Sequence, residues 1–221
     1  DLLNLLDRKI DGKNIQRIIY LWILKYSNFK NKIWENSVLS SRVISWMLNI
    51  DIIINNGTFD FKKKVFQNII YQCNHLKKNI KYEKNPVKRI QVLTALILSG
   101  IIFKEYKFNY DLGIKELEKF VKHYFDSDGF PFTRNPNDLI FFTQYLLLCR
   151  ENINEAQEMA PEFLSEIIQK NLSCIKFIKT PDDKLPLFNG SSESDLNHFE
   201  KYLEKLKLSK KEKKNTVGGI Y

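Results

Sequence analysis

The sequence predicts an all-α fold built from antiparallel helical hairpins. Glycine and proline are scarce, at 8 and 6 of 221 residues, whereas an all-β protein needs frequent turn residues. Apolar residues recur at spacings of three and four over most of the chain, which is the period of an amphipathic helix. Because only short breaks separate these segments, consecutive helices are expected to be antiparallel neighbours.

The first half of the chain predicts four helices, at residues 14–27, 36–48, 61–80 and 86–103. The first contains a solid apolar block from Ile18 to Leu24. The third follows Asp60, a suitable N-cap, and its apolar positions step by threes and fours. The fourth begins at Pro86, in keeping with the first-turn preference of proline, and is apolar nearly all round, which is typical of a buried helix.

The second half predicts four more helices, at residues 110–125, 137–150, 161–178 and 194–206. The first of these ends at the Asp126-Ser127-Asp128-Gly129 turn, and an irregular loop is expected over 185–194. We therefore expect one helical domain over residues 1–214. Residues 215–221 have strand character from Val217 onward and are expected to open a second, β-rich domain.

The charge pattern and the absence of long apolar runs limit the classes of protein. The chain has 35 basic and 26 acidic residues, a net charge of +9, and a positive surface attracts polyanions such as acidic polysaccharide or nucleic acid. A solubilising lysine surface is the alternative interpretation. No apolar stretch approaches the roughly 18 residues that a transmembrane helix requires, so none is predicted. The chain begins at Asp1 rather than methionine, and an upstream segment is expected.

Cysteine and histidine give no sign of a metal centre. The three cysteines are odd in number and lack metal-ligand spacing. Cys73 and Cys149 lie within apolar helical patterns and are expected to be buried. No metal and no cofactor are predicted in this chain. The histidines are widely separated, and a surface position is expected for each. The cysteines are Cys73, Cys149 and Cys174, and the histidines are His75, His123 and His198.

The helix at 36–48 and the residues before it contain the first candidate binding residues. Trp34 precedes the helix, and Arg42 and Trp46 lie four residues apart on one helix face. A guanidinium group pairs bidentately with a carboxylate, and a flat indole ring can stack on a pyranose, so the group suits an acidic sugar. The alternative is a structural arginine held against core aromatic residues.

Two loops contain the second group of candidates. Residues 128–138 combine two phenylalanines, an arginine and two asparagines between two strong helices, and residues 185–190 form a second candidate loop. Loops at one end of a helical array commonly form the wall of a cleft. A loop that only caps helices is the alternative.

Four segments also carry a family resemblance. They are W-x4-L-x2-R-x3-W at 34–46, Ser-Gly-Ile-Ile-Phe at 99–103, the loop at 128–136, and residues 183–189. With them the chain resembles the heparinase II/III-like polysaccharide lyase family, in particular its alphaproteobacterial branch. The resemblance implies an incomplete α/α toroid, followed by an antiparallel β-sandwich that residues 218–221 would begin. It also implies β-elimination on a uronate-containing polysaccharide.

The resemblance does not assign the catalytic residues. β-Elimination needs a base for the proton next to the carboxylate, and donors or positive charge for the enolate-like anion. The family's Asn-His pair aligns with Val87 and Lys88, and its tyrosine and the histidine that follows align with Asp138 and Leu139. The catalytic residues of this chain are therefore left unknown.

The resemblance does suggest further binding residues. Arg134 aligns with a basic position of the family loop, and Asn189 aligns with the asparagine of the later loop. Lys88, Arg89 and Asn135 are expected to supply positive charge or hydrogen bonds nearby. The complete predicted substrate-binding set is Trp34, Arg42, Trp46, Lys88, Arg89, Arg134, Asn135 and Asn189.

Three functional hypotheses remain open at this point. The first is a polysaccharide lyase, with this chain as its helical substrate-cleft domain. The second is a non-catalytic relative that binds cell-envelope polysaccharide or assists its synthesis. The third is a helical-repeat module that binds protein or nucleic acid through a basic groove, with strong salt dependence. The first two predict an acidic polysaccharide as partner, no nucleic acid, and a periplasmic or cell-envelope location.

Overall fold

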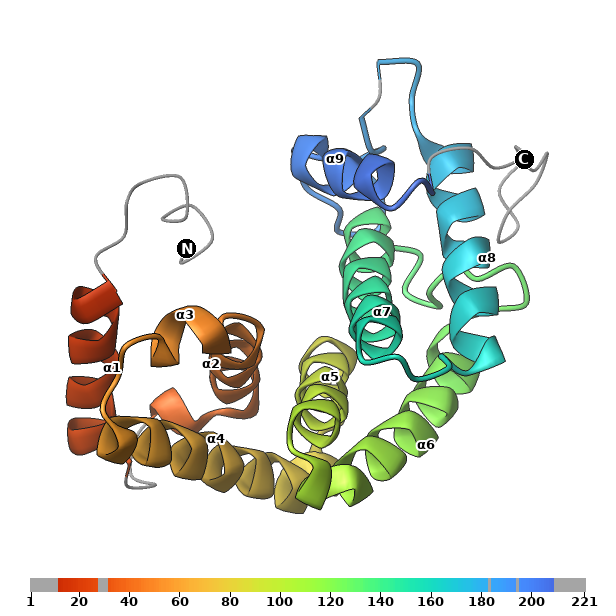
Figure 1. The fold of residues 1–221 in the computed structure, drawn as a ribbon. Helices are drawn as coiled ribbons and strands as arrows, with labels where there is room; N and C mark the ends of the chain where they lie inside the picture. Colours follow the sequence, from red (N-terminus) through yellow and green to blue (C-terminus); the bar gives the residue numbers. More distant parts are fainter. Residues whose placement is uncertain (1–11, 28–31, 183, 194, 209–221) are drawn as a thin grey trace. The chain divides into compact units, whose positions relative to one another are not determined.

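The computed structural model describes residues 12–27, 32–182, 184–193 and 195–208 (Figure 1). The regular secondary structure of these residues is helical, and the β-structure within them is one isolated bridge between Phe125 and Pro131. The predicted all-α class is therefore confirmed. The chain divides into two compact units, Asp1–Gly113 and Ile114–Tyr221.

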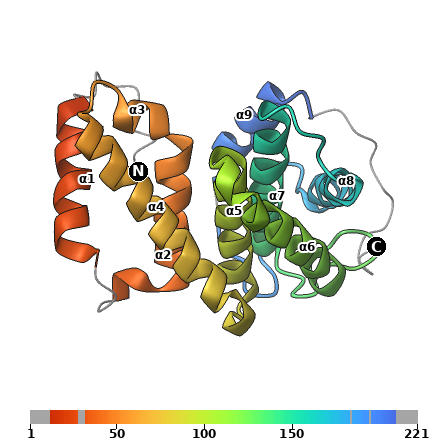
Figure 2. The same ribbon diagram turned by 60° about the horizontal axis from the view of Figure 1, so that its bottom comes forward.

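The first unit is a set of helices in which α2 and α4 pack against each other and against α5. Its α-helices and 3-10 turns are α1 (Gly12–Tyr26), η2 (Lys32–Trp34), α2 (Asn36–Leu48), α3 (Ile50–Ile54), α4 (Phe59–Asn79), η3 (Ile80–Tyr82), α5 (Pro86–Ile102) and η4 (Lys104–Tyr106). Helix α2 packs against α4 and α5, and α1 packs against α3 and α4 (Figure 2). Every residue from Ile90 to Gly100 is buried, as predicted for a helix that is apolar nearly all round.

The start of α6 (Lys107–Tyr124) also lies in the first unit and packs closely on α5. A β-carbon on Gly100 would lie 2.4 Å from the backbone nitrogen of Tyr110, and one on Gly113 would lie 2.7 Å from Cγ1 of Ile97. Both glycines are therefore needed for the close approach of the two helices. Asn109 is 1% exposed, and its Nδ2 donates to Ser99 Oγ over 3.0 Å.

The second unit contains the rest of α6 together with α7 (Pro136–Glu155), α8 (Glu162–Ile178) and α9 (Asn197–Lys205). Helices α7 and α8 pack along each other. The rings of Phe120, Phe125 and Phe142 meet in its core, with centroids 5.6 to 6.3 Å apart. Such edge-on aromatic packing adds to the stabilisation from area burial.

Several helix limits differ from those predicted, and the caps explain two of them. Helix α4 begins at Phe59, because Oγ1 of Thr58 accepts a hydrogen bond from the Phe61 nitrogen over 3.3 Å. Asp60 is therefore not the N-cap; it lies in the first turn and pairs with Lys64 at 2.9 Å. Asn135 caps α7, which begins one residue earlier than predicted.

Other differences concern length. Helix α7 continues to Glu155 instead of ending at Arg150, since Ile153 adds another buried position to its apolar face. Helix α6 begins at Lys107 rather than residue 110, and α9 begins at Asn197 rather than residue 194. The short helix α3 and the three 3-10 turns lack enough residues to produce a periodic pattern, and the sequence did not predict them.

The cysteines are buried in the helical core, and the described helices are too short or too polar to cross a membrane. Cys73, Cys149 and Cys174 are all buried, which confirms the prediction for the first two. None of the helices in the described segments has both the length and the hydrophobicity to cross a bilayer. The predicted domain boundary between residues 214 and 215, and the predicted sandwich start at 215–221, lie outside the described residues.

Candidate functional site

Arg42 on α2 is held by protein groups of the first unit. Its guanidinium carbon lies 4.1 Å above the Trp22 ring. Its Nε donates to Gln72 Oε1 over 2.8 Å, and its Nη1 donates to the Ile33 carbonyl over 3.2 Å. Nη2 is buried and has no hydrogen-bond partner among the described residues. Burial away from water lowers the pKa of Arg42 to about 10, because desolvation disfavours the charged form.

The two tryptophans predicted to bind sugar lie in the protein core. Trp34 and Trp46 are each 5% exposed. Trp34 donates through Nε1 to the Tyr26 carbonyl over 2.9 Å. Trp46 meets the edge of Trp22 at 5.3 Å, and Trp22, not Trp46, is the ring that Arg42 covers. This group therefore matches the alternative interpretation, a structural arginine held against core aromatics.

His75 differs from the surface position predicted for it. It is half-buried, and its ring lies 5.5 Å from the ring of Trp34. Burial, with a smaller contribution from the charge on Lys78, lowers its pKa. His123 and His198 are exposed, as predicted.

The basic pair at the start of α5 is half-buried. Arg89 donates through Nη1 to the carbonyl of Glu83 over 3.1 Å and to that of Ile80 over 3.5 Å. It therefore ties the turn after α4 to the first turn of α5. The backbone nitrogen of Lys88 donates to the Asn85 side chain that caps the same helix.

In the second unit, the loop between α6 and α7 is organised around Asp126. Its Oδ1 accepts hydrogen bonds from the backbone nitrogens of Asp128 and Phe130 at 2.9 and 2.8 Å. Its Oδ2 pairs with Nη1 of Arg134 at 2.5 Å. The Arg134 side chain is still 30% exposed, so it holds the loop and also reaches solvent.

Helix α8 supports this loop. Gly129 has a φ of +89°, and a β-carbon on it would lie 2.4 Å from Cβ of Lys170. The Asn171 side chain, oriented to satisfy both of its polar atoms, donates to the Gly129 carbonyl over 3.0 Å and accepts from Thr143. Cys174 Sγ lies 3.2 Å from the Asp128 carbonyl. The loop therefore has a fixed backbone.

Three predicted site residues meet where this loop joins the loop after α8. Nδ2 of Asn189 donates to the Arg134 carbonyl over 3.2 Å, and a β-carbon on Gly190 would lie 3.5 Å from Nδ2 of Asn135. Arg134 and Asn189 have φ angles of 53° and 49°. Asparagine tolerates this left-handed conformation well, whereas it is uncommon for arginine.

Further polar residues at the same place escaped the sequence prediction. Asn137 donates through Nδ2 to Ser192 Oγ over 2.9 Å, and its Oδ1 accepts from Ser191 Oγ over 3.1 Å. The Asn-Pro-Asn sequence at the start of α7 could have indicated Asn137 as a polar site residue. Nothing in the sequence indicated its pairing with Ser192 and Ser191, which lie 55 and 54 positions later. We call these six residues the loop cluster: Arg134, Asn135, Asn137, Asn189, Ser191 and Ser192.

Two exposed apolar side chains and the residues that line a pocket lie close to the loop cluster in sequence. Phe132 is 59% exposed and Leu187 is 61% exposed. A pocket of about 310 Å³ is lined by Lys184, Leu185, Leu187, Glu193 and Asp195. The loops therefore offer apolar surface as well as hydrogen-bonding groups.

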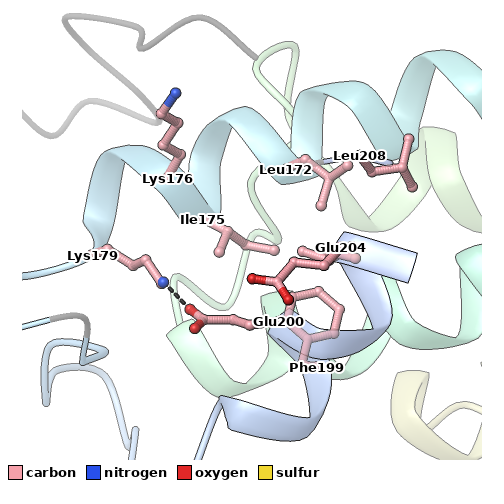
Figure 3. A pocket seen from close by; sticks show the side chains of 9 residues that line it. Leu172, Ile175, Lys176, Lys179, Phe199, Glu200, Glu204 and Leu208 are labelled. Atoms are coloured by element: carbon pink, nitrogen blue, oxygen red, sulfur yellow. Dashed lines mark hydrogen bonds and ion pairs between the residues drawn. The ribbon is translucent and has the colours of Figure 1, made fainter. Parts of the chain in front are cut away.

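A second pocket of the same unit lies between α8 and α9 (Figure 3). It has a volume of about 180 Å³ and a largely apolar floor that includes Leu172, Ile175 and Phe199. An ion pair between Lys179 and Glu200 lies at its edge. None of the predicted site residues lines this pocket. In the described part of the chain, no cluster of histidine, cysteine and carboxylate side chains could hold a metal ion.

Comparisons with known proteins address the family and the fold. The family model described as heparinase II/III N-terminus matches residues 22–214. No curated protein matches the chain significantly. The chain is structurally similar to the heparan sulfate lyase HepC from Pedobacter heparinus, with a TM-score of 0.70, 18% identity, and coverage of 89% of this chain and 34% of that one.

A mutant of the same lyase gives a TM-score of 0.73 at 17% identity, with coverage of 94% of this chain and 37% of that one. The chain thus spans about a third of the length of these structures. At this level of identity the likeness supports the fold alone. It confirms the predicted fold class, an all-α domain of the incomplete α/α toroid type.

Proposed function

Because the chain belongs to the heparinase II/III family, whose N-terminal domain model it matches, we propose that it binds an acidic, uronate-containing polysaccharide. It is a polysaccharide lyase-related helical domain, and the loop cluster of the second unit is the part that holds the sugar chain. The observation that carries this proposal is the convergence of Arg134, Asn135 and Asn189 from two loop segments that are distant in sequence.

The chemistry of the loop cluster fits such a ligand. Asparagine amides and serine hydroxyls both donate and accept hydrogen bonds, as the hydroxyl groups of a sugar require. The partly exposed guanidinium of Arg134 supplies donors with the fork geometry that matches a carboxylate. The exposed ring of Phe132 is flat and apolar and can lie against a pyranose face. The backbone is already fixed, which lowers the ordering cost of binding.

The loop cluster supplies binding groups for β-elimination but no base. Its members are amides, hydroxyls and one guanidinium, and none of these removes a proton at neutral pH. Arg134 would counter the charge that develops on the carboxylate side of the anion. If the protein is a lyase, the base lies outside the loop cluster.

A non-catalytic function is the second candidate, and the aligned catalytic positions favour it. Val87 and Lys88 lie in the first turn of α5, and Asp138 lies in the first turn of α7. Leu139 is fully buried. The chain would then bind cell-envelope polysaccharide or assist its synthesis. Both candidates place the protein in the periplasm or cell envelope with an acidic polysaccharide, and not a nucleic acid, as partner.

An absorbance assay separates the two candidates. The protein would be mixed with alginate, heparan sulfate and related acidic polysaccharides while ultraviolet absorbance of unsaturated uronate product is recorded. A rise in absorbance identifies a lyase. A flat trace with measurable binding identifies the non-catalytic relative. No binding to any acidic polysaccharide would reject the proposal.

A charge-matched pair of variants tests the loop cluster itself. Asn189→Asp removes a donor and adds a negative charge, so it should weaken binding of a uronate tetrasaccharide by about tenfold, since 1.4 kcal/mol corresponds to a factor of ten. Asn154→Asp adds the same charge at an exposed position on α7 and should leave affinity nearly unchanged. Equal affinities of the two variants would remove the loop cluster from the site.

A further inference from the structure

The basic excess of the protein belongs entirely to its first unit. Residues 1–113 contain 19 basic and 9 acidic residues, a net charge of +10, whereas residues 114–221 contain 16 basic and 17 acidic residues. Lysines are divided almost equally, with 15 in the first unit and 14 in the second, so the difference in net charge comes mainly from the acidic residues. The first unit therefore has few acidic residues to offset its lysines, and a positive surface attracts polyanions.

Most of that excess lies between the start of α4 and the first turn of α5. Residues 59–89 contain nine basic and two acidic residues, a net charge of +7. Both acidic residues are engaged within the protein. Asp60 pairs with Lys64 at 2.9 Å. Glu83 accepts hydrogen bonds from Asn36 Nδ2 at 2.9 Å and from the Asn85 nitrogen at 3.1 Å.

Exposed aromatic rings lie among these lysines. Tyr82 is 69% exposed and Phe108 is 46% exposed. Nζ of Lys81 lies 4.7 Å from the centre of the Tyr82 ring, and Nζ of Lys77 lies 3.9 Å from the centre of the Phe108 ring. Ammonium groups and flat rings thus form one mixed surface. We call it the α4-end surface, made of Lys77, Lys78, Lys81, Tyr82, Lys84 and Phe108.

The helix dipole explains only part of this arrangement. Lys77 and Lys78 lie in the last turn of α4, where a positive charge is favoured by the helix dipole. Lys81 and Lys84 lie beyond the end of α4, and both are exposed. The dipole effect falls off within the last turn and does not explain them. The backbone next to Phe108 is held in place, because the following residue, Asn109, is hydrogen-bonded to Ser99 in the core.

We propose that the α4-end surface is a second polyanion-binding surface, which takes a sulfated or uronate-containing polysaccharide chain. Its lysines would pair with sulfate or carboxylate groups, and its two rings would lie against sugar rings. It is separate in sequence and composition from the loop cluster, which has a single cation. The choice of polysaccharide over another polyanion rests on the proposed function, whereas the polyanion surface itself does not.

Two triple variants with the same change in charge test this inference. The first is Lys78→Gln, Lys81→Gln and Lys84→Gln, and the control is Lys201→Gln, Lys205→Gln and Lys207→Gln on and just after α9, where all three lysines are also exposed. The probe is heparin, and Kd is measured from low to high salt. We expect the first variant to bind on the order of tenfold more weakly, with a shallower salt dependence because it releases fewer counterions. The control should bind like the native protein.

Equal weakening in both variants would show a net-charge effect and overturn the proposal, as would unchanged binding in the first. Tyr82→Ala tests the saccharide assignment. It should weaken heparin binding and leave binding of inorganic polyphosphate unchanged, because polyphosphate has no rings. Tighter binding of single-stranded DNA or anionic vesicles than of heparin at this surface would overturn the choice of polysaccharide. The tetrasaccharide affinity of Asn189→Asp reports on the loop cluster independently, so each proposal can fail alone.

Discussion

At the scale of single residues, Arg42 makes its hydrogen bonds inside the first unit, and its replacement should lower the stability of the protein. Replacing it with alanine would leave Gln72 Oε1 and the Ile33 carbonyl without their donor and would uncover the Trp22 ring. We expect Arg42→Ala to lower the free energy of unfolding by about 1–3 kcal/mol in urea denaturation. Arg17→Ala, at an exposed position on α1, is the control and should have little effect. A native-like midpoint for Arg42→Ala would contradict the structural role.

Gly129 is the second residue whose surroundings predict a clear effect of substitution on stability. Gly129→Ala would place a methyl group 2.4 Å from Cβ of Lys170 at a φ of +89°. Because strain and overlap add, we expect a loss of about 2 kcal/mol or more in thermal or urea unfolding. Gly12→Ala is the matched control, since a β-carbon at that position would have no neighbour within 4 Å among the described residues. The explanation fails if both substitutions have the same small effect.

Residue types were easier to predict than their partners. The sequence singled out Arg42 and Trp46 because they share a helix face, but the ring under Arg42 belongs to Trp22 on another helix. Spacing along one helix gives no information on which ring from a second helix arrives there. Similarly, Asn135 and Asn189 came from loop composition and family resemblance, while Ser191 and Ser192 became visible only when two distant loops met.

At the scale of elements, the cap of α4 can be tested by its effect on stability. Thr58→Ala removes the side-chain acceptor for the Phe61 nitrogen and should lower stability by about 1 kcal/mol. Asp60→Ala removes only an exposed pair with Lys64 and should cost about a few tenths of a kcal/mol, roughly the value of a surface ion pair. Circular dichroism during urea unfolding measures both. A larger loss of stability from the Asp60 substitution than from Thr58→Ala would show that Asp60 is the cap.

Long periodic helices were predictable because burial follows the helical period. The limits of α2 agree with prediction at both ends, and the buried helix α5 agrees within one residue. Thr58 and Asp60 are both acceptable caps by residue type, so composition could not choose between them. The five residues of α3 are too few for a periodic signal, and their helical state depends on packing against α1.

At the scale of the whole molecule, the three buried thiols report on both units. Cys73, in the first unit, is 1% exposed and burial raises its pKa to about 12. Cys149 and Cys174, in the second unit, are 1% and 0% exposed. Since the thiolate is the reactive form, we expect almost no reaction of the native protein with an aromatic disulfide reagent at neutral pH. All three thiols should react after denaturation in urea. Rapid labelling of any one of them in the native protein would contradict its burial.

The contact between Asn189 and Arg134 also has a consequence for the chemical lifetime of the protein. Asn189 is exposed and is followed by Gly190, and a glycine leaves the next backbone nitrogen open to attack on the asparagine amide. The resulting succinimide hydrolyses to aspartate or isoaspartate. Deamidation at this position would remove the donor to the Arg134 carbonyl and place a carboxylate where an acidic sugar is proposed to bind. Ageing at alkaline pH would thus weaken the proposed binding of a polyuronate at the loop cluster.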